Sequence, residues 1–108
     1  MKLYVGGAWQ GQEELARSEN PEAEIWPDFH ETIREAVQQG KDPRAFAHWM
    51  VETHSEAVIV SNEVGAGVVP IMAEDRAFRE MVGRALCVIA QNAETVTRVV
   101  CGIGMRIK

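Results

Sequence analysis

A strand-like apolar run that ends in polar residues and glycines constrains the fold more than any other feature of the sequence. Residues 57–60 (AVIV) form the run, and residues 61–70 (SNEVGAGVVP) follow it directly. In an open α/β sheet, ligands bind in the crevice beyond the carboxyl ends of the strands. The stretch therefore predicts either a site loop at Asn62, Glu63, Gly65 and Gly67 or a plain turn that uses Asn and Gly for their backbone freedom.

The composition predicts one globular domain over residues 1–108. The chain is 46% hydrophobic and 25% charged, and its net charge of −5 argues against a module that binds duplex nucleic acid. Two cysteines, Cys87 and Cys101, cannot build a disulfide framework, which favours a reduced, cytoplasmic protein. No apolar run approaches the roughly 18 residues of a membrane span, and the N-terminus lacks the layout of a signal peptide.

Apolar runs and helical periodicity alternate along the chain. We expect strands at residues 2–5, 23–26, 57–61 and 96–101, an edge strand near 105–107, and helices near 13–17, 28–39, 42–54 and 73–92. Strands that alternate with helices predict an α/β layer fold with a small, mainly parallel sheet flanked by helices.

Two aspartates mark predicted helix starts. Asp28 and Glu31 have the capping-box spacing, in which the aspartate accepts from first-turn amides and the glutamate reaches back. Gly40 should stop that helix. Asp42 and Pro43 then offer an N-cap and a proline at the first helical position.

A glycine loop between the first strand and the first helix has the spacing of a phosphate loop. That pattern is Gly, four residues, Gly, Lys, then Ser or Thr; its lysine reaches the β and γ phosphates and its hydroxyl holds magnesium. Gln12 and Glu13 stand at the lysine and hydroxyl positions. We interpret the stretch as a vestigial phosphate loop, with a ligand-free glycine turn as the alternative, and we expect Trp9 to plug the lysine's space. The candidate loop positions are Gly6, Gly7, Ala8, Gly11, Gln12 and Glu13.

With these stretches in view, the chain resembles a known family. Residues 60–70, the run 76–84 (RAFREMVGR) and the ending 99–108 are similar to the bifunctional adenosylcobinamide kinase/adenosylcobinamide-phosphate guanylyltransferases of cobalamin biosynthesis. The resemblance covers roughly residues 57–108 without a gap, and residues 3–16 in layout.

The resemblance implies a RecA-like, three-layer P-loop fold that binds GTP or ATP with Mg²⁺ and a corrinoid. Family members phosphorylate adenosylcobinamide, transfer a guanylyl group through a covalent histidine intermediate, and assemble as trimers. It also implies site roles at the signature positions, where Asp28 corresponds equally well to a magnesium-type aspartate or an N-cap. These positions are Asp28, Asn62, Glu63, Gly65, Gly67, Arg79 and Arg84.

The chain departs from the family where chemistry takes place. The loop has lost its lysine and its hydroxyl, and the segment that carries the guanylyl-accepting histidine is missing before Ile25. The chain's own histidines, His30, His48 and His54, lie in helical stretches, and we expect them at the surface or facing a partner. Leu86-Cys87 replaces a polar Asn-Gln pair of the family, and we expect Cys87 in the core; solvated helix faces are the alternative for Arg79 and Arg84.

Three functions follow from these observations. The leading hypothesis is a scaffold with a weakened nucleotide or corrinoid pocket and impaired or absent catalysis. The second is an active kinase with a relocated basic residue, such as Lys2, Lys41 or an arginine of a neighbouring subunit. The third is a non-enzymatic interaction protein on the same scaffold.

Overall fold

The chain folds around a five-stranded, mostly parallel sheet. The structure is a computed structural model that describes residues 1–63 and 73–108, apart from the side chains of 73–75; the predicted positions Gly65 and Gly67 lie outside the described residues. The sheet order is β2-β3-β1-β4-β5, and only β5 runs antiparallel to its neighbour. The strands are β1 (Lys2–Gly6), β2 (Ile25–Trp26), β3 (Val58–Asn62), β4 (Thr95–Val100) and β5 (Ile103–Arg106).

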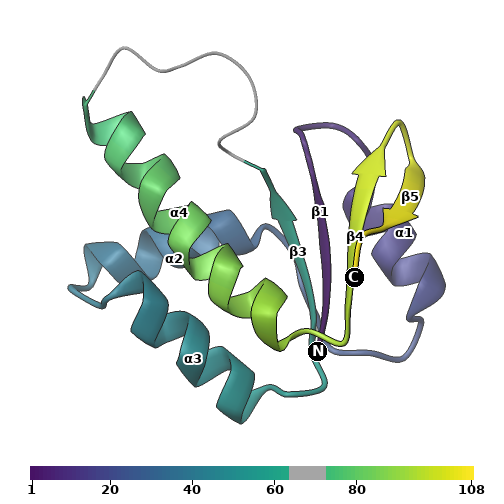
Figure 1. Ribbon diagram of the computed structural model, residues 1–108, viewed down its shortest axis with the longest axis horizontal. Coiled ribbons are helices and arrows are strands. Elements are labelled where there is room, and N and C mark those ends of the chain that lie inside the picture. Colours follow the sequence, from purple (N-terminus) through teal and green to yellow (C-terminus); the bar gives the residue numbers. More distant parts are fainter. Residues whose placement is uncertain (64–72) are drawn as a thin grey trace.

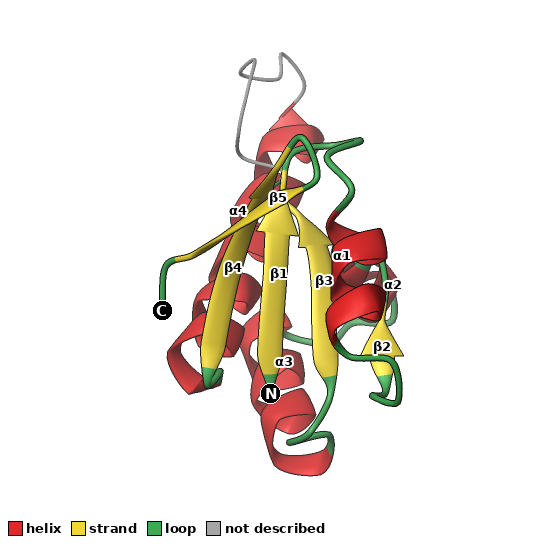
Figure 2. Ribbon diagram, turned by 90° about the vertical axis from the view of Figure 1, so that its right-hand side faces the viewer, coloured by secondary structure: helices red, strands yellow, loops and turns green. Residues whose placement is uncertain are grey.

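Helices cover both faces of this sheet, as Figures 1 and 2 show. Three of them lie on one face and α1 lies on the other, which confirms the predicted α/β fold with helices flanking the sheet. None of the four helices in the described residues combines the length and the apolar composition needed to cross a membrane. The helices are α1 (Gln12–Glu19), α2 (Phe29–Gln38), α3 (Pro43–Thr53) and α4 (Ala73–Asn92).

The alternation of side chains along the strands divides the core into two clusters. On one face, Leu3, Val5 and Ile59 pack against α2, α3 and α4, where Phe29 and Ile89 are fully buried. The second cluster, on the α1 face, is smaller and consists of Tyr4, Ala16, Val58, Val60 and Val99.

The helix starts confirm one predicted cap and contradict the other. Asp42 accepts a hydrogen bond from the Ala45 amide at 2.9 Å, and Pro43 is the first helical residue, as expected. Asp28 makes no side-chain cap, because its backbone is left-handed (φ 52°, ψ 47°) rather than extended as at an ordinary N-cap. Glu31 pairs with Arg34 at 3.2 Å instead of reaching back.

Two predictions about burial are wrong. Cys87 is exposed on α4, because the buried stripe of that helix runs through Val82, Ala85 and Ile89. His30 is buried rather than on the surface, because it packs under the end of β3.

Candidate functional site

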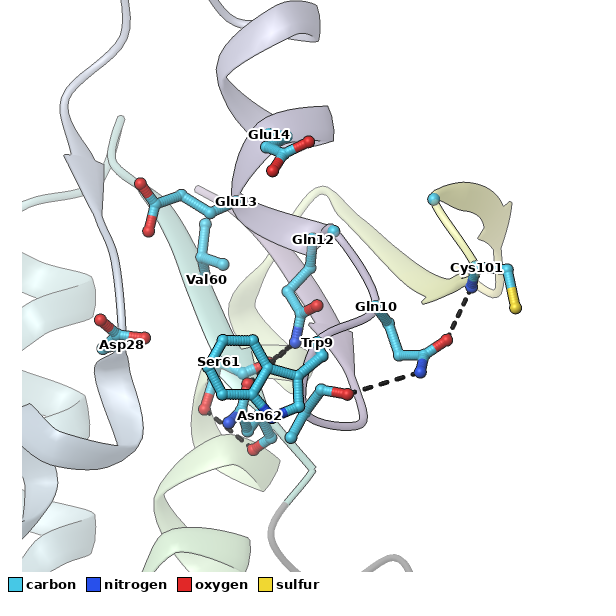
Figure 3. A pocket seen from close by; sticks show the side chains of 13 residues that line it. Trp9, Gln10, Gln12, Glu13, Glu14, Asp28, Val60, Ser61, Asn62 and Cys101 are labelled. Carbon is cyan, nitrogen blue, oxygen red and sulfur yellow. Dashed lines mark hydrogen bonds between the residues drawn. The ribbon is translucent and has the colours of Figure 1, made fainter.

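A cavity of about 600 Å³ lies at the carboxyl edge of β1 and β3 (Figure 3). This is the edge where ligands bind in open α/β sheets. The cavity is lined by residues 8–14 of the glycine loop and α1, by residues 60–62 of β3, by Asp28, and by the turn 101–102 between β4 and β5. The structure thus brings most of the predicted loop together with Asn62 and Asp28.

Two glycines of the loop are required by the backbone around them. A Cβ at Gly6 would lie 2.6 Å from the carbonyl oxygen of Val99, a contact that real Cβ atoms essentially never make. Gly11 has a φ of 85°, which side chains rarely adopt, and a Cβ there would lie 3.5 Å from the Cα of Gly102. Sheet packing and turn geometry therefore account for both glycines without a phosphate.

Gln12 fills the interior of the loop. Its side chain is only 6% exposed. Its Nε2 atom donates to Oδ1 of Asn62 at 2.9 Å and lies 3.1 Å from the Gly7 carbonyl oxygen and 3.2 Å from that of Gly6. Because each neighbour is an acceptor, a nitrogen must stand at this position. The amide joins the loop to the end of β3, so its donors point at the protein and are not offered to a ligand (Figure 3).

Gln10 connects the loop to the β4–β5 turn, a contact that no spacing or motif along the chain predicts. Its Oε1 accepts from the Cys101 amide at 2.7 Å, and its carbonyl oxygen accepts from the Gly102 amide at 2.7 Å. Both turn residues have positive φ, 51° at Cys101 and 75° at Gly102, as a type I′ hairpin turn requires.

Trp9 does not plug the loop, so that prediction is wrong. Its side chain is 99% exposed, and its backbone is left-handed (φ 64°). The bulk of an indole is unnecessary inside the loop, because the Gln12 amide already occupies the space and its donors are satisfied there.

At the end of β3, the side chain of Asn62 lines the cavity and that of Glu63 does not. Asn62 lines the cavity, and its backbone N–H donates to Nδ1 of the buried His30 at 3.2 Å, which puts the proton of a neutral imidazole on Nε2. The Glu63 amide donates to the Gly6 carbonyl at 2.7 Å. Its carboxylate lies 3.6 Å from Nε of Arg98 and is not among the cavity lining.

The cavity is acidic. Glu13, Glu14 and Asp28 line it, and no lysine or arginine of the described residues does. Glu13 pairs with Arg17 at 3.0 Å on the next turn of α1. An acidic lining opposes a polyphosphate, which needs donors and cations around it.

The basic residues considered for the site lie elsewhere. Nζ of Lys2 donates to Asn20 at 3.0 Å, and Lys41 lies over the Phe46 ring, 5.7 Å from its centre. Arg84 pairs with Glu80 on α4. Neither Arg84 nor Arg79, also on α4, is among the described residues that line the cavity.

The donor set does not fit a magnesium–nucleotide. Over residues 1–63 and 76–108, no three His, Cys, Asp or Glu side chains are grouped so that they could hold a metal ion. The loop has an amide where a cation would meet phosphate and a carboxylate where a hydroxyl would meet magnesium.

Comparison with known proteins places this chain in a family. Two relatives, each described as "Bifunctional adenosylcobalamin biosynthesis protein CobU", from Escherichia coli (strain K12) and Salmonella typhimurium (strain LT2), are 44% identical to the chain over 54 residues. The match covers 50% of this chain and 30% of each relative, so the chain aligns with less than a third of their length. The family model described as "Cobinamide kinase / cobinamide phosphate guanyltransferase" matches residues 11–107, and the chain therefore belongs to the cobinamide kinase / cobinamide phosphate guanyltransferase family.

Proposed function

We propose that this chain is a non-catalytic member of its family: one cytoplasmic domain over residues 1–108 that keeps the scaffold and has lost phosphoryl and guanylyl transfer. The placement of Gln12 carries the proposal. Its amide stands at the lysine position of the phosphate loop and donates to the protein's own carbonyl groups.

The chemistry of phosphoryl transfer explains why this loss matters. Catalysis rests on positioning and on electrostatic stabilisation of charge on the transferred group. A neutral amide cannot offset that charge, and Glu13 adds a negative charge at the same helix start. Glu14 and Asp28 extend the acidic lining, so binding of a purine nucleotide with Mg²⁺ would be weak.

The geometry also argues against a kinase that uses a relocated basic residue of its own. Lys2 lies at the opposite end of β1 from the glycine loop, and Lys41 lies between α2 and α3. Of the three basic residues that this alternative considers, the arginine of a neighbouring subunit is left, because Lys2 and Lys41 both lie away from the loop.

Calorimetry and a kinase assay test the proposal together. GTP and ATP are titrated with Mg²⁺, and phosphorylation of adenosylcobinamide is followed with each nucleotide. We expect no turnover and an affinity weaker than micromolar. Sub-micromolar affinity accompanied by turnover would contradict the proposal.

A matched pair of variants shows whether the loop is the cause. Gln12→Lys with Glu13→Thr restores the pattern and should strengthen nucleotide binding relative to the wild type. Gln38→Lys with Glu35→Thr makes the same change in charge on the exposed part of α2 and should leave binding unchanged. Equal strengthening in both pairs would mean that overall charge, rather than the loop, limits binding.

A second candidate function, an interaction protein on the same scaffold, is favoured by one observation. Val100, Ile103, Met105 and Ile107 are large hydrophobic side chains that are exposed together at the β4–β5 hairpin. Exposed apolar groups that gather in one place often mark an interaction surface.

A further inference from the structure

A second, polar cavity of about 350 Å³ lies on the α1 face of the sheet. It shares no lining residue with the cavity at the glycine loop. α1 packs against β1 and β3, and Figure 2 shows β4 beside it with no described helix in front. The cavity extends from the end of α1 across the strands β1, β4 and β5. Its lining consists of Lys2, Tyr4, Glu19, Asn20, Thr95, Thr97, Gly104 and Arg106.

The strand register places two cations and two hydroxyl groups on the same face of the sheet. Across β1 and β4, Lys2 lies opposite Thr95 and Tyr4 lies opposite Thr97. Across β4 and β5, Thr97 lies opposite Arg106. Directly opposed residues share a face, and so do residues two apart along a strand. Tyr4 belongs to the buried cluster on the α1 face, so the ammonium and the guanidinium flank β4 on that face, with the threonines between them.

Four side chains of this cavity keep hydrogen-bond donors for a ligand. Nζ of Lys2 donates to Oδ1 of Asn20 at 3.0 Å, which leaves two of its three N–H groups. Nε of Arg106 donates to a backbone carbonyl oxygen at 3.0 Å, and its Nη groups bond to no described residue. The hydroxyls of Thr95 and Thr97 also have no partner among the described residues, and neither is sealed from solvent.

The wall formed by the end of α1 is held by its own hydrogen bonds. The Tyr4 hydroxyl donates to Glu19 at 2.7 Å and accepts from Nδ2 of Asn20 at 3.1 Å. The same Asn20 amide donates to the Ala16 carbonyl oxygen at 3.0 Å. These bonds position Asn20, and through it Lys2, before a ligand binds. A site that is ordered in advance loses less conformational entropy on binding.

We propose that this cavity binds a small oxyanion, a carboxylate or a phosphate group, between Lys2 and Arg106. The two cations donate to the anion from opposite sides of β4, and charge-assisted bonds of this kind are about twice as strong as neutral ones. The lining has two cations against the single carboxylate of Glu19. The chain as a whole carries a net charge of −5, so an anion that binds must be attracted locally. The proposal does not depend on nucleotide binding at the glycine loop.

Titration with inorganic phosphate and, separately, with succinate tests the proposal. The amide NMR spectrum of the isotope-labelled chain locates the residues that respond. We expect saturable shifts at Thr95, Thr97 and Arg106, with a dissociation constant in the millimolar range for at least one of the two anions. Binding of only one identifies whether the group is a phosphate or a carboxylate. No saturable shift in the cavity with either anion, or shifts confined to residues 6–13, would overturn the proposal.

Substitution of the cations separates the cavity from overall charge. Arg106→Gln and Lys2→Gln each remove one cation, and each should raise the dissociation constant at least about tenfold. Arg106→Lys keeps the charge and should weaken binding less than Arg106→Gln. Lys41→Gln removes the same charge beside Phe46, away from this cavity, and should leave binding unchanged. An unchanged affinity in Arg106→Gln, or equal weakening in Lys41→Gln, would refute the site.

Two further variants test the sign of the charge and the role of a hydroxyl. Glu19→Gln keeps an acceptor for the Tyr4 hydroxyl and removes the negative charge, so binding should tighten about twofold to fivefold. Thr97→Val keeps the shape of the side chain without its hydroxyl and should weaken binding about fivefold. Urea denaturation of both variants confirms that the fold is retained. Weaker binding in Glu19→Gln would contradict an anionic ligand.

Discussion

The two faces of the sheet are held in different ways. On the face covered by α2, α3 and α4, large side chains such as Phe29, Ile33 and Met50 are fully buried. On the α1 face the apolar cluster is small, and polar contacts of Gln12 and Tyr4 join the helix and its loop to the strands. The fold is thus stabilised mainly on one face, so a substitution in the glycine loop should cost less stability than one among the large side chains of α2, α3 and α4.

The largest effect should come from the well-packed face. Phe29→Ala leaves a cavity among α2, α3 and the sheet, and we expect it to lower the free energy of unfolding by about 3–5 kcal/mol. Urea denaturation followed by circular dichroism measures the loss. Trp9→Ala, at a fully exposed side chain, should change the same quantity by less than about 0.5 kcal/mol. Similar losses in the two variants would show that burial of Phe29 does not account for the stability of this face.

A glycine substitution separates a structural role in the loop from a ligand-binding one. The Cβ of Gly6→Ala would lie 2.6 Å from the Val99 carbonyl oxygen. Relief of that clash must separate β1 from β4, so we expect a loss of about 1–3 kcal/mol in unfolding free energy. At Gly7 the nearest atom to a Cβ is 3.8 Å away on Gln10, and Gly7→Ala is the matched control. If both variants are as stable as the wild type, Gly6 is not needed for packing.

Removing the Gln12 amide should weaken the face that depends on polar contacts. Gln12→Leu leaves the Gly6 and Gly7 carbonyls and Oδ1 of Asn62 without this donor. An unsatisfied buried polar group costs about 1–3 kcal/mol, and we expect a loss in that range by urea denaturation. Gln12→Lys keeps a donor and should cost less. A Leu variant more stable than the Lys variant would show that the amide does not hold the loop.

The elements of the fold were predictable because they rest on local patterns. Period-two and 3.6-residue spacing located the strands and the four helices, and the Asp42-Pro43 pair located a helix start. β5 begins at Ile103, two residues earlier than expected, because the hairpin turn uses only Cys101 and Gly102. A tight turn of this kind has no Asn-Gly signal in this sequence, so the strand was expected too late.

The wrong predictions at the site have a common cause. Each concerns a side chain whose position is determined by tertiary contacts and not by local sequence. The capping box at Asp28 fails because the backbone there is left-handed, and His30 is buried because β3 passes above it. The prediction places the Trp9 side chain inside the glycine loop. The Gln12 side chain occupies the interior of that loop, so Trp9 points to solvent. Spacing along the chain carries none of this information.

The smallest effect concerns the hydroxyl that ties α1 to β1. Tyr4, the only tyrosine of the chain, donates to Glu19 at 2.7 Å and accepts from Asn20 at 3.1 Å. Burial, and next the bond to Glu19, raise the pKa of Tyr4 above its ordinary value of 10.0. Because the folded state favours the neutral phenol, this contribution to stability is fully present below pH 10.0 and is lost as the pH rises through the folded-state pKa.

Titration of the tyrosinate absorbance measures this pKa without interference from another tyrosine. Glu19→Gln should lower the pKa of Tyr4 but leave it above 10.0, because burial is the larger cause. Asn20→Ala should raise it, because the Asn20 amide favours the phenolate. Glu22→Gln removes an exposed carboxylate with no contact to Tyr4 among the described bonds and should leave the titration unchanged. A shift in the same direction for Glu19→Gln and Asn20→Ala would mean that loosening of α1, and not these two bonds, governs the ionisation.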